Sequence, residues 1–318
     1  MAAGAKKQLP EGKAGDAEVG RRAWTLDELR HKRAKVKEAL DYMKALPSEA
    51  EIVRLAVTGL TGNDTDDGRR EAALEILLDL AGLIDVANDL EALGAIPPIM
   101  EQLSHPSPQF RAMAANIIGT AAANNPVFSQ HATAHGAVPA LLARLRGDET
   151  EVRVKALFAL SQLVRAPGPA LDAFTGGGGL STLYALVSTT HEVHKLRLRA
   201  VVLLSDIAMS NPQVDVLLPA KELLHVAAAI SDMASKASEW DVLEKLLRAC
   251  SQLLGAGNQG RTMARALVTV GFDAAVEAAF HRLLAEAAPP DGAYTTELAA
   301  LREEVRGLAG HEAVRDEL

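Results

Sequence analysis

The fold is decided by Leu93-Gly94-Ala95-Ile96-Pro97-Pro98-Ile99, a segment that the chain repeats. It returns 42 residues later as His135-Gly136-Ala137-Val138-Pro139-Ala140-Leu141, and a weaker copy, Gly177-Gly178-Gly179-Leu180-Ser181-Thr182-Leu183, follows after the same step. A fixed step of this size indicates stacked units, because each unit buries its apolar face against a neighbour. The sequence therefore predicts an array rather than one compact core.

Each unit contains helical patterns and no competing strand pattern. Apolar residues at Val152, Ala156, Ala159, Leu160 and Leu163 recur at helical spacing and predict a buried stripe. Prolines close successive apolar runs, because proline cannot continue a helix. A helical period near 42 residues is typical of armadillo and HEAT repeats. We expect an all-α fold, an armadillo/HEAT-like right-handed superhelical solenoid with flanking capping helices.

The chain is expected to fall into four parts. The first is rich in Ala, Gly, Lys and Glu and predicts disorder, and the second predicts a charged helix in which Thr25 and Glu28 form a capping box. The last is expected to contain a helix over Thr295–Leu308. The predicted parts are a disordered segment over 1–23, a charged helix over 24–46, the solenoid over 47–287, and a capping helix and tail over 288–318.

Composition excludes several classes of function. The 318 residues carry 33 basic and 41 acidic side chains, for a net charge of −8, and 3% are aromatic. Such a chain is not expected to bind nucleic acid. Cys250 is the single cysteine, so neither a disulfide framework nor a Cys-based zinc site is expected. Because no apolar stretch approaches about 18 residues, no membrane span is expected.

Several features resemble chemical sites, and each has a simpler interpretation. Gly255–Gly260 fits the G-x-G-x-x-G pattern of dinucleotide sites, but a predicted helix rather than a strand precedes it. The run Gly176–Gly179 falls at a junction between repeats, where a turn is sufficient. Two histidine pairs lack the third ligand that zinc requires: His131 with His135, and His191 with His194. We expect no catalytic residues, no cofactor and no metal, and therefore no enzyme.

Two short motifs bear on the compartment. The sequence finishes with Arg315-Asp316-Glu317-Leu318, a close variant of the Lys/His-Asp-Glu-Leu retrieval signal of the endoplasmic reticulum. A weaker indication is the triplet Asn63-Asp64-Thr65, in which Asn63 fits the pattern of an N-glycosylation site. No secretory signal is visible at the N-terminus. We expect the lumen of the endoplasmic reticulum, with the cytoplasm as the alternative.

Beyond the repeat, the sequence contains five characteristic blocks, and ordinary armadillo proteins lack the third and the fifth of them in this order. They are Pro47-Ser48-Glu49-Ala50, Ala73-Leu74-Glu75-Ile76-Leu77-Leu78, Ile84-Asp85-Val86-Ala87-Asn88-Asp89-Leu90, Ala115-Asn116-Ile117-Ile118-Gly119-Thr120 with Asn124-Asn125-Pro126, and Val154-Lys155-Ala156-Leu157-Phe158-Ala159-Leu160-Ser161-Gln162-Leu163-Val164-Arg165. Through them the chain, from about Pro47 to Leu254, resembles the armadillo-type nucleotide exchange factors of DnaK-type, seventy-kilodalton heat-shock chaperones.

The resemblance implies a function without catalysis. Such factors grip one lobe of the chaperone's ATPase domain with their concave face, open the nucleotide cleft and release ADP. The partner is expected to be a heat-shock protein 70 family chaperone, BiP-like if the protein is lumenal. The period places these candidates for partner binding on the concave face: Arg111, Asn116, Arg153, Lys155, Phe158, Lys195, Arg197 and Arg199.

Two interpretations of these residues stay open. A basic rank at a step of 42, formed by Arg69, Arg111, Arg153 and Lys195, favours an acidic partner surface, although each residue can equally be a solvated helix start. Asn116 can instead anchor one helix to the next. The alternative function is a scaffold that binds a peptide or protein without exchange activity. Against a peptide groove, the only tryptophans are not one period apart.

Overall fold

A computed structural model describes residues 25–62, 66–210, 220–286 and 292–314, and every regular element in these ranges is a helix. The chain divides into two units between Ser48 and Glu49. The first unit contains α1 (Leu26–Ala45), which begins with the predicted capping box. The Thr25 hydroxyl accepts from the Glu28 backbone N–H at 3.2 Å, and the Glu28 carboxylate accepts from the Thr25 N–H at 2.9 Å.

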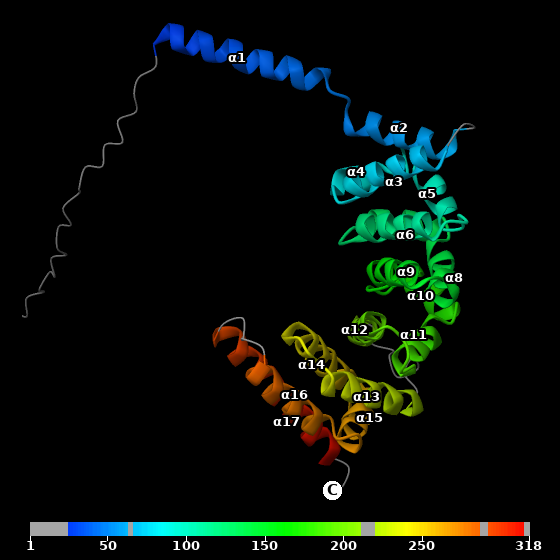
Figure 1. Ribbon diagram of the computed structural model, residues 1–318, viewed down its shortest axis with the longest axis vertical. Coiled ribbons are helices and arrows are strands. Elements are labelled where there is room, and N and C mark those ends of the chain that lie inside the picture. Colours follow the sequence, from blue (N-terminus) through cyan, green and yellow to red (C-terminus); the bar gives the residue numbers. More distant parts are fainter. Residues whose placement is uncertain (1–24, 63–65, 211–219, 287–291, 315–318) are drawn as a thin grey trace, which may run out of the picture. The chain divides into compact units, whose positions relative to one another are not determined.

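The second unit is a stack of helices (Figure 1). Short, medium and long helices follow in triplets, α4–α6, α7–α9, α10–α12 and α15–α17, and α13 and α14 form a pair in the described residues. The helices are α2 (Glu49–Thr61), α3 (Asp67–Ala81), α4 (Ile84–Asp89), α5 (Ile96–Gln102), α6 (Pro108–Ala122), α7 (Pro126–Ala134), α8 (Ala137–Gly147), α9 (Thr150–Leu163), α10 (Pro169–Gly176), α11 (Gly179–Ser188), α12 (His194–Ser210), α13 (Ala220–Ser235), α14 (Trp240–Leu254), α15 (Gly257–Thr269), α16 (Phe272–Glu286) and α17 (Gly292–Val314).

The long helices form one continuous row. Helix α3 packs on α6, α6 on α9, α9 on α12, α12 on α14, and α14 on α17. We call these six helices the third-helix row. In Figure 1, α3, α6, α9 and α12 follow one another along one side of the stack, with α5, α8 and α11 along the other. The predicted all-α solenoid is confirmed.

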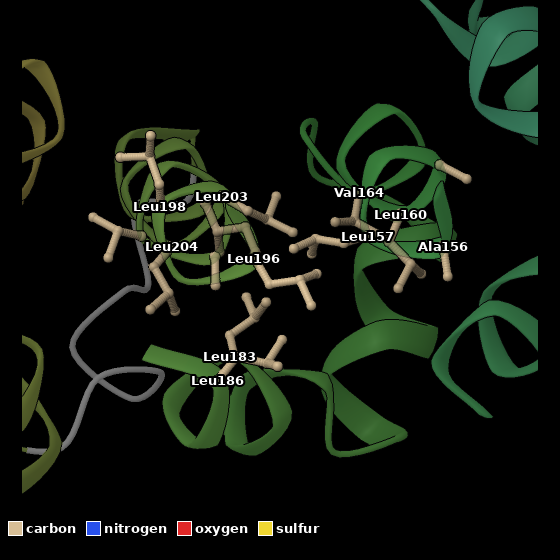
Figure 2. Packing of buried hydrophobic residues seen from close by; sticks show 14 of the residues in the cluster. Ala156, Leu157, Leu160, Val164, Leu183, Leu186, Leu196, Leu198, Leu203 and Leu204 are labelled. Atoms are coloured by element: carbon tan, nitrogen blue, oxygen red, sulfur yellow. The ribbon is translucent and has the colours of Figure 1, made fainter. Parts of the chain in front are cut away.

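The core follows the predicted apolar stripe. The five stripe residues of α9 are each at most 5% exposed. Figure 2 shows Leu157 and Leu160 of α9 among the leucines of α11 and α12. Between α6 and α9 the approach is closer, because a Cβ atom on Gly119 would lie 2.6 Å from the Phe158 ring. Small residues at such crossings let the third helices pack face to face.

The repeated glycine of the sequence motif has a backbone role. Gly94, Gly136 and Gly178 have positive φ angles of 68°, 79° and 76°. L side chains rarely adopt this left-handed conformation, and glycine adopts it freely. Each of these glycines lies at the turn into the second helix of a unit, and Gly136 and Gly178 are the N-caps of α8 and α11. The segment that predicts the fold therefore encodes this turn.

The C-terminal part differs in detail from the prediction. The predicted helix over Thr295–Leu308 lies within the longer α17, the third member of a further triplet. The G-x-G-x-x-G pattern lies at a junction between helices, since Gly255 caps the end of α14 and α15 begins at Gly257. Gly176–Gly179 is likewise the α10–α11 junction. Both glycine-rich segments therefore lie at junctions between two helices, and no strand precedes either of them in the described residues, in line with their simpler interpretation.

Candidate functional site

The basic residue that repeats in the sequence makes contacts between neighbouring units of the array. Four third helices carry an arginine as their fourth residue: Arg70 in α3, Arg111 in α6, Arg153 in α9 and Arg197 in α12. We call these four residues the arginine ladder. Each side chain reaches from its own helix to a side chain of the next unit, which lies in or just after the helix that precedes the next member of the third-helix row.

Arg111 makes the largest set of contacts in the ladder. Its guanidinium donates to both carboxylate oxygens of Asp148, at 2.8 and 2.6 Å, and to Glu149 at 2.6 Å. It also donates to the backbone carbonyls of His105 and Pro106 at 2.8 and 2.6 Å. The side chains of Arg111 and Asp148 are 11% and 3% exposed, so a bidentate ion pair is buried between two units.

The other ladder arginines follow the same plan. They donate to a side chain in the next unit: Arg153 to Glu192 through two nitrogens, Arg197 to Asp232 at 3.2 Å, and Arg70 to Gln102 at 3.1 Å. Because breaking a buried pair leaves an uncompensated charge, the ion pairs of Arg111, Arg153 and Arg197 are expected to hold neighbouring units together.

The ladder also changes the acidity of its partners. Burial by itself raises the pKa of the Asp148 carboxyl, but its hydrogen bonds, led by those from Arg111, outweigh burial and lower the pKa to about 2. Burial likewise opposes the shift at Glu192, where the hydrogen bond from Arg153 lowers the pKa. Hydrogen bonds to the charged form therefore keep both carboxylates ionised at neutral pH.

This arrangement corrects the predicted register of the basic rank. The fixed step of 42 residues placed Arg69 and Lys195 at the position equivalent to Arg111 and Arg153. In the structure the residues at that helix position are Arg70 and Arg197. The reason is loop length, because α12 starts 44 residues after α9. The repetition of a basic residue is therefore explained by contacts between units, and an acidic partner is not needed to account for it.

A groove opens beside the ladder, along the third-helix row. It lies between α9, α12 and α14 and has a volume of about 550 Å³. Three predicted residues line it together: Phe158 from α9, and Lys195 and Arg199 from α12. Apolar side chains, among them Leu198 and Val242, line it together with further charged side chains. We call this hollow the third-helix groove.

The charges of the groove are only partly paired. Arg165 lies 3.4 Å from Asp206, and Arg199 donates to the Val154 carbonyl at 3.3 Å. Burial lowers the pKa of Arg199 and raises that of Asp206, where the charge of Arg165 opposes the shift. Lys195 is exposed at the start of α12. The groove thus offers cations, a desolvated carboxylate and apolar surface, as protein interfaces do.

The remaining predicted residues lie elsewhere. Asn116 and Lys155 are half-buried on α6 and α9 and do not line the groove. Asn63 and Arg315–Leu318 lie outside the described residues. Sequence reasoning missed Asp206, although it follows Arg199 by seven residues, a spacing that returns to the same helix face.

The described residues also bear on metal binding, thiol chemistry and membrane spanning. They contain no group of three or more His, Cys, Asp or Glu side chains that could hold a metal ion. His135 contacts the Glu91 carboxylate at 2.9 Å instead. Cys250 is fully buried, which raises its pKa, so it is a small residue of the core. None of the described helices is both long and apolar enough to cross a bilayer.

Comparison with solved structures defines the class of protein. A designed armadillo repeat protein in complex with the peptide (KR)4 matches with a TM-score of 0.64 at 18% identity, over 81% of this chain and 99% of that one. Computationally designed armadillo repeat proteins for modular peptide recognition match with a TM-score of 0.61 at 20% identity, over 79% and 99%. The chain therefore has the armadillo-type fold.

Comparison of sequences gives the family. The profile of the SIL1/FES1/HPBP1 C-terminal domain matches residues 86–218. Proteins named Hsp70 nucleotide exchange factor FES1 are 36% identical in Coccidioides immitis, over 40% of this chain and 60% of the relative, and 33% identical in Gibberella zeae, over 44% and 70%. Hsp70-binding protein 1 of Mus musculus is 30% identical over 67% and 60%. The chain belongs to the SIL1/FES1/HPBP1 family, and it spans about three fifths of the length of two of these relatives.

Proposed function

We propose that this protein is a nucleotide exchange factor for a heat-shock protein 70 family chaperone. The observation that carries the proposal is its similarity, at 33–36% identity, to relatives named Hsp70 nucleotide exchange factors. The third-helix groove supports it, because it joins charged and apolar groups on one face of a repeat array. Such a factor is a regulator of an ATPase and not itself a catalyst.

The mechanism requires only differential binding. A factor that binds the open nucleotide cleft more tightly than the closed, ADP-bound cleft shifts the chaperone toward the open state. By linkage, the factor lowers the chaperone's affinity for ADP by the same ratio by which ADP lowers the chaperone's affinity for the factor. A stiff surface is needed, since a flexible one would follow the chaperone through both states. The ion pairs of the arginine ladder, which tie neighbouring units together, support this requirement.

The contact residues follow from the groove. We propose that Phe158, Lys195 and Arg199 contact the chaperone, with Lys155 and Asn116 as further candidates on the adjacent part of the row. Arg111, Arg153 and Arg197 are left out of this set, because their guanidinium groups are paired within the protein.

The test is the release of fluorescently labelled ADP from the chaperone, with the full chain added. We expect faster release, and we expect Lys195→Glu to require several-fold more protein for the same rate, because a reversed charge at an interface slows association. Lys221→Glu is the matched control, an exposed lysine on α13 with the same change in net charge. Unchanged release at saturating protein would contradict the proposal. Binding without faster release would support a scaffold instead.

We also propose that the protein acts in the lumen of the endoplasmic reticulum on a BiP-like chaperone. The support is the sequence Arg315-Asp316-Glu317-Leu318, together with the triplet at Asn63. In cells that make the protein naturally, we expect it to co-fractionate with a lumenal marker and to resist protease until the membrane is opened. Protease sensitivity in intact microsomes would place it in the cytoplasm.

A further inference from the structure

A second hollow lies at the edge of the stack, where α6 and α9 end. Helix α7 forms one wall and the segment between α9 and α10 forms the other, around a volume of about 930 Å³. This volume is within the range of about 300–1,000 Å³ that ligand sites occupy. We call it the edge pocket. Its characteristic residues are Asn124, Asn125, Gln130, Gln162 and Pro167.

The edge pocket is almost without charge. Arg165 is the one charged residue among those described that line it, and its guanidinium lies 3.4 Å from the Asp206 carboxylate. The third-helix groove, by contrast, is lined by lysine, arginine, aspartate and glutamate side chains. A charged ligand group would lose its hydration in the edge pocket without gaining a counter-ion. The ligand that fits is therefore uncharged.

Carboxamides provide the polar groups of this pocket. Asn124 and Gln130 are exposed, and their side chains make no hydrogen bond within the described part of the chain. Asn125 is 3% exposed, and its Oδ1 caps α7 by accepting from the Phe128 N–H at 3.0 Å. Its Nδ2 meets no acceptor in the same part of the chain. A carboxamide offers one donor group and one acceptor group, as a peptide unit does.

The walls are preformed and elongated. Pro126, Pro167 and Pro169 fix the backbone on both sides. On α7, Pro126, Gln130 and Ala134 line the pocket at four-residue spacing, so the lining stripe runs along the whole helix. At a rise of about 1.5 Å per residue this stripe is about 12 Å long, which matches about four residues of extended chain.

From these features we infer that the edge pocket binds an extended, uncharged polypeptide segment through its main chain. Side-chain carboxamides pair with the peptide groups of the segment, and the apolar surface of Leu163, Ala166 and the prolines contacts its side chains. The pocket adjoins the third-helix groove at Arg165, which lines both. It is nevertheless a separate site, and it functions without the chaperone.

The test uses three pools of end-blocked hexapeptides: uncharged, acidic and basic. Each pool is equilibrated with the immobilised full chain, and retained peptides are quantified by mass spectrometry. We expect the uncharged pool to be retained at least tenfold above the other two. Ala134→Trp fills the pocket from the exposed end of α7, and we expect it to reduce retention at least tenfold.

Two further variants keep the test decisive. Ala143→Trp, at an exposed alanine of α8 outside the pocket, is the matched control and is expected to retain peptides like the wild type. Gln130→Glu combined with Gln162→Glu keeps the side-chain shapes, adds charge and is expected to abolish retention. The inference is overturned if Ala134→Trp binds as the wild type does, or if all three pools are retained equally. Because no chaperone is present, failure here leaves the exchange proposal standing.

Discussion

The two halves of the third-helix row are held together in different ways. From α6 to α12, an arginine at the fourth position of each helix bonds to a carboxylate of the next unit, and its side chain is at most 19% exposed. In α14 the fourth residue is the buried Leu243. The polar contacts of α14 with α17 include the surface pair Arg248–Glu297, whose side chains are 54% and 71% exposed, and a hydrogen bond that the Tyr294 hydroxyl donates to Glu244. Ion pairs at one fixed helix position therefore link neighbouring units in the first half of the row, and other contacts replace them in the second half.

The largest difference in stability between the two halves is expected from a substitution at Arg111. We expect Arg111→Ala to lower the free energy of unfolding by about 3 kcal/mol, because it leaves the buried Asp148 carboxylate unpaired. Arg248→Ala in the other half is the matched control and is expected to cost less than about 1 kcal/mol, since its pairs are exposed. Urea denaturation measures both. Equal losses would show that the two halves are held alike.

The close approach of α6 and α9 gives the next effect. Gly119→Ala places a Cβ atom 2.6 Å from the Phe158 ring, and we expect a loss of about 2 kcal/mol from overpacking. Gly147→Ala is the control, because its added Cβ meets nothing within 4 Å. Thermal unfolding of both variants tests this prediction. A Gly119→Ala protein as stable as the wild type would mean that the helices separate without cost.

Acid should destabilise the α6–α12 half of the third-helix row by protonating Asp148. Its pKa is about 2 in the folded protein, against an ordinary value of 3.8. Since the folded value is lower, the stabilisation is fully present above pH 4 and is lost as the pH falls toward 2. The shift corresponds to about 2 kcal/mol. We expect Asp148→Asn to be less stable at neutral pH and to lack this part of the acid dependence. A parallel acid profile in the variant would contradict the assignment.

The smallest expected effect concerns His105, in the loop that Arg111 holds. Burial, and next the charge of Arg70, lower the pKa of His105, and its Nδ1 accepts from the Ser107 N–H at 3.1 Å. Protonation is thus disfavoured in the folded state, so stability should decline as the pH falls below about 6.5. His105→Gln should flatten the profile between pH 7 and 5, measured by urea denaturation. An unchanged slope would contradict this role.

Local sequence patterns were sufficient to predict the fold, but they did not reveal the contacts between units. The glycines at 94, 136 and 178 predict the repeat because a left-handed turn requires that residue type. The arginine ladder was misaligned by one or two residues, because loop lengths vary while the packing position is constant. The groove residues Phe158, Lys195 and Arg199 were predicted from the period, but Asp206 became evident only when α9, α12 and α14 were brought together.

One measurement tests the central claim most directly. The full chain is titrated into the chaperone's ATPase domain by calorimetry, first without nucleotide and then at saturating ADP. If the third-helix row prefers the open cleft, the Kd is expected to be at least about tenfold weaker with ADP, by the reciprocity of linked binding. The same Kd in both conditions would contradict the account, because a factor that binds both states equally cannot promote release.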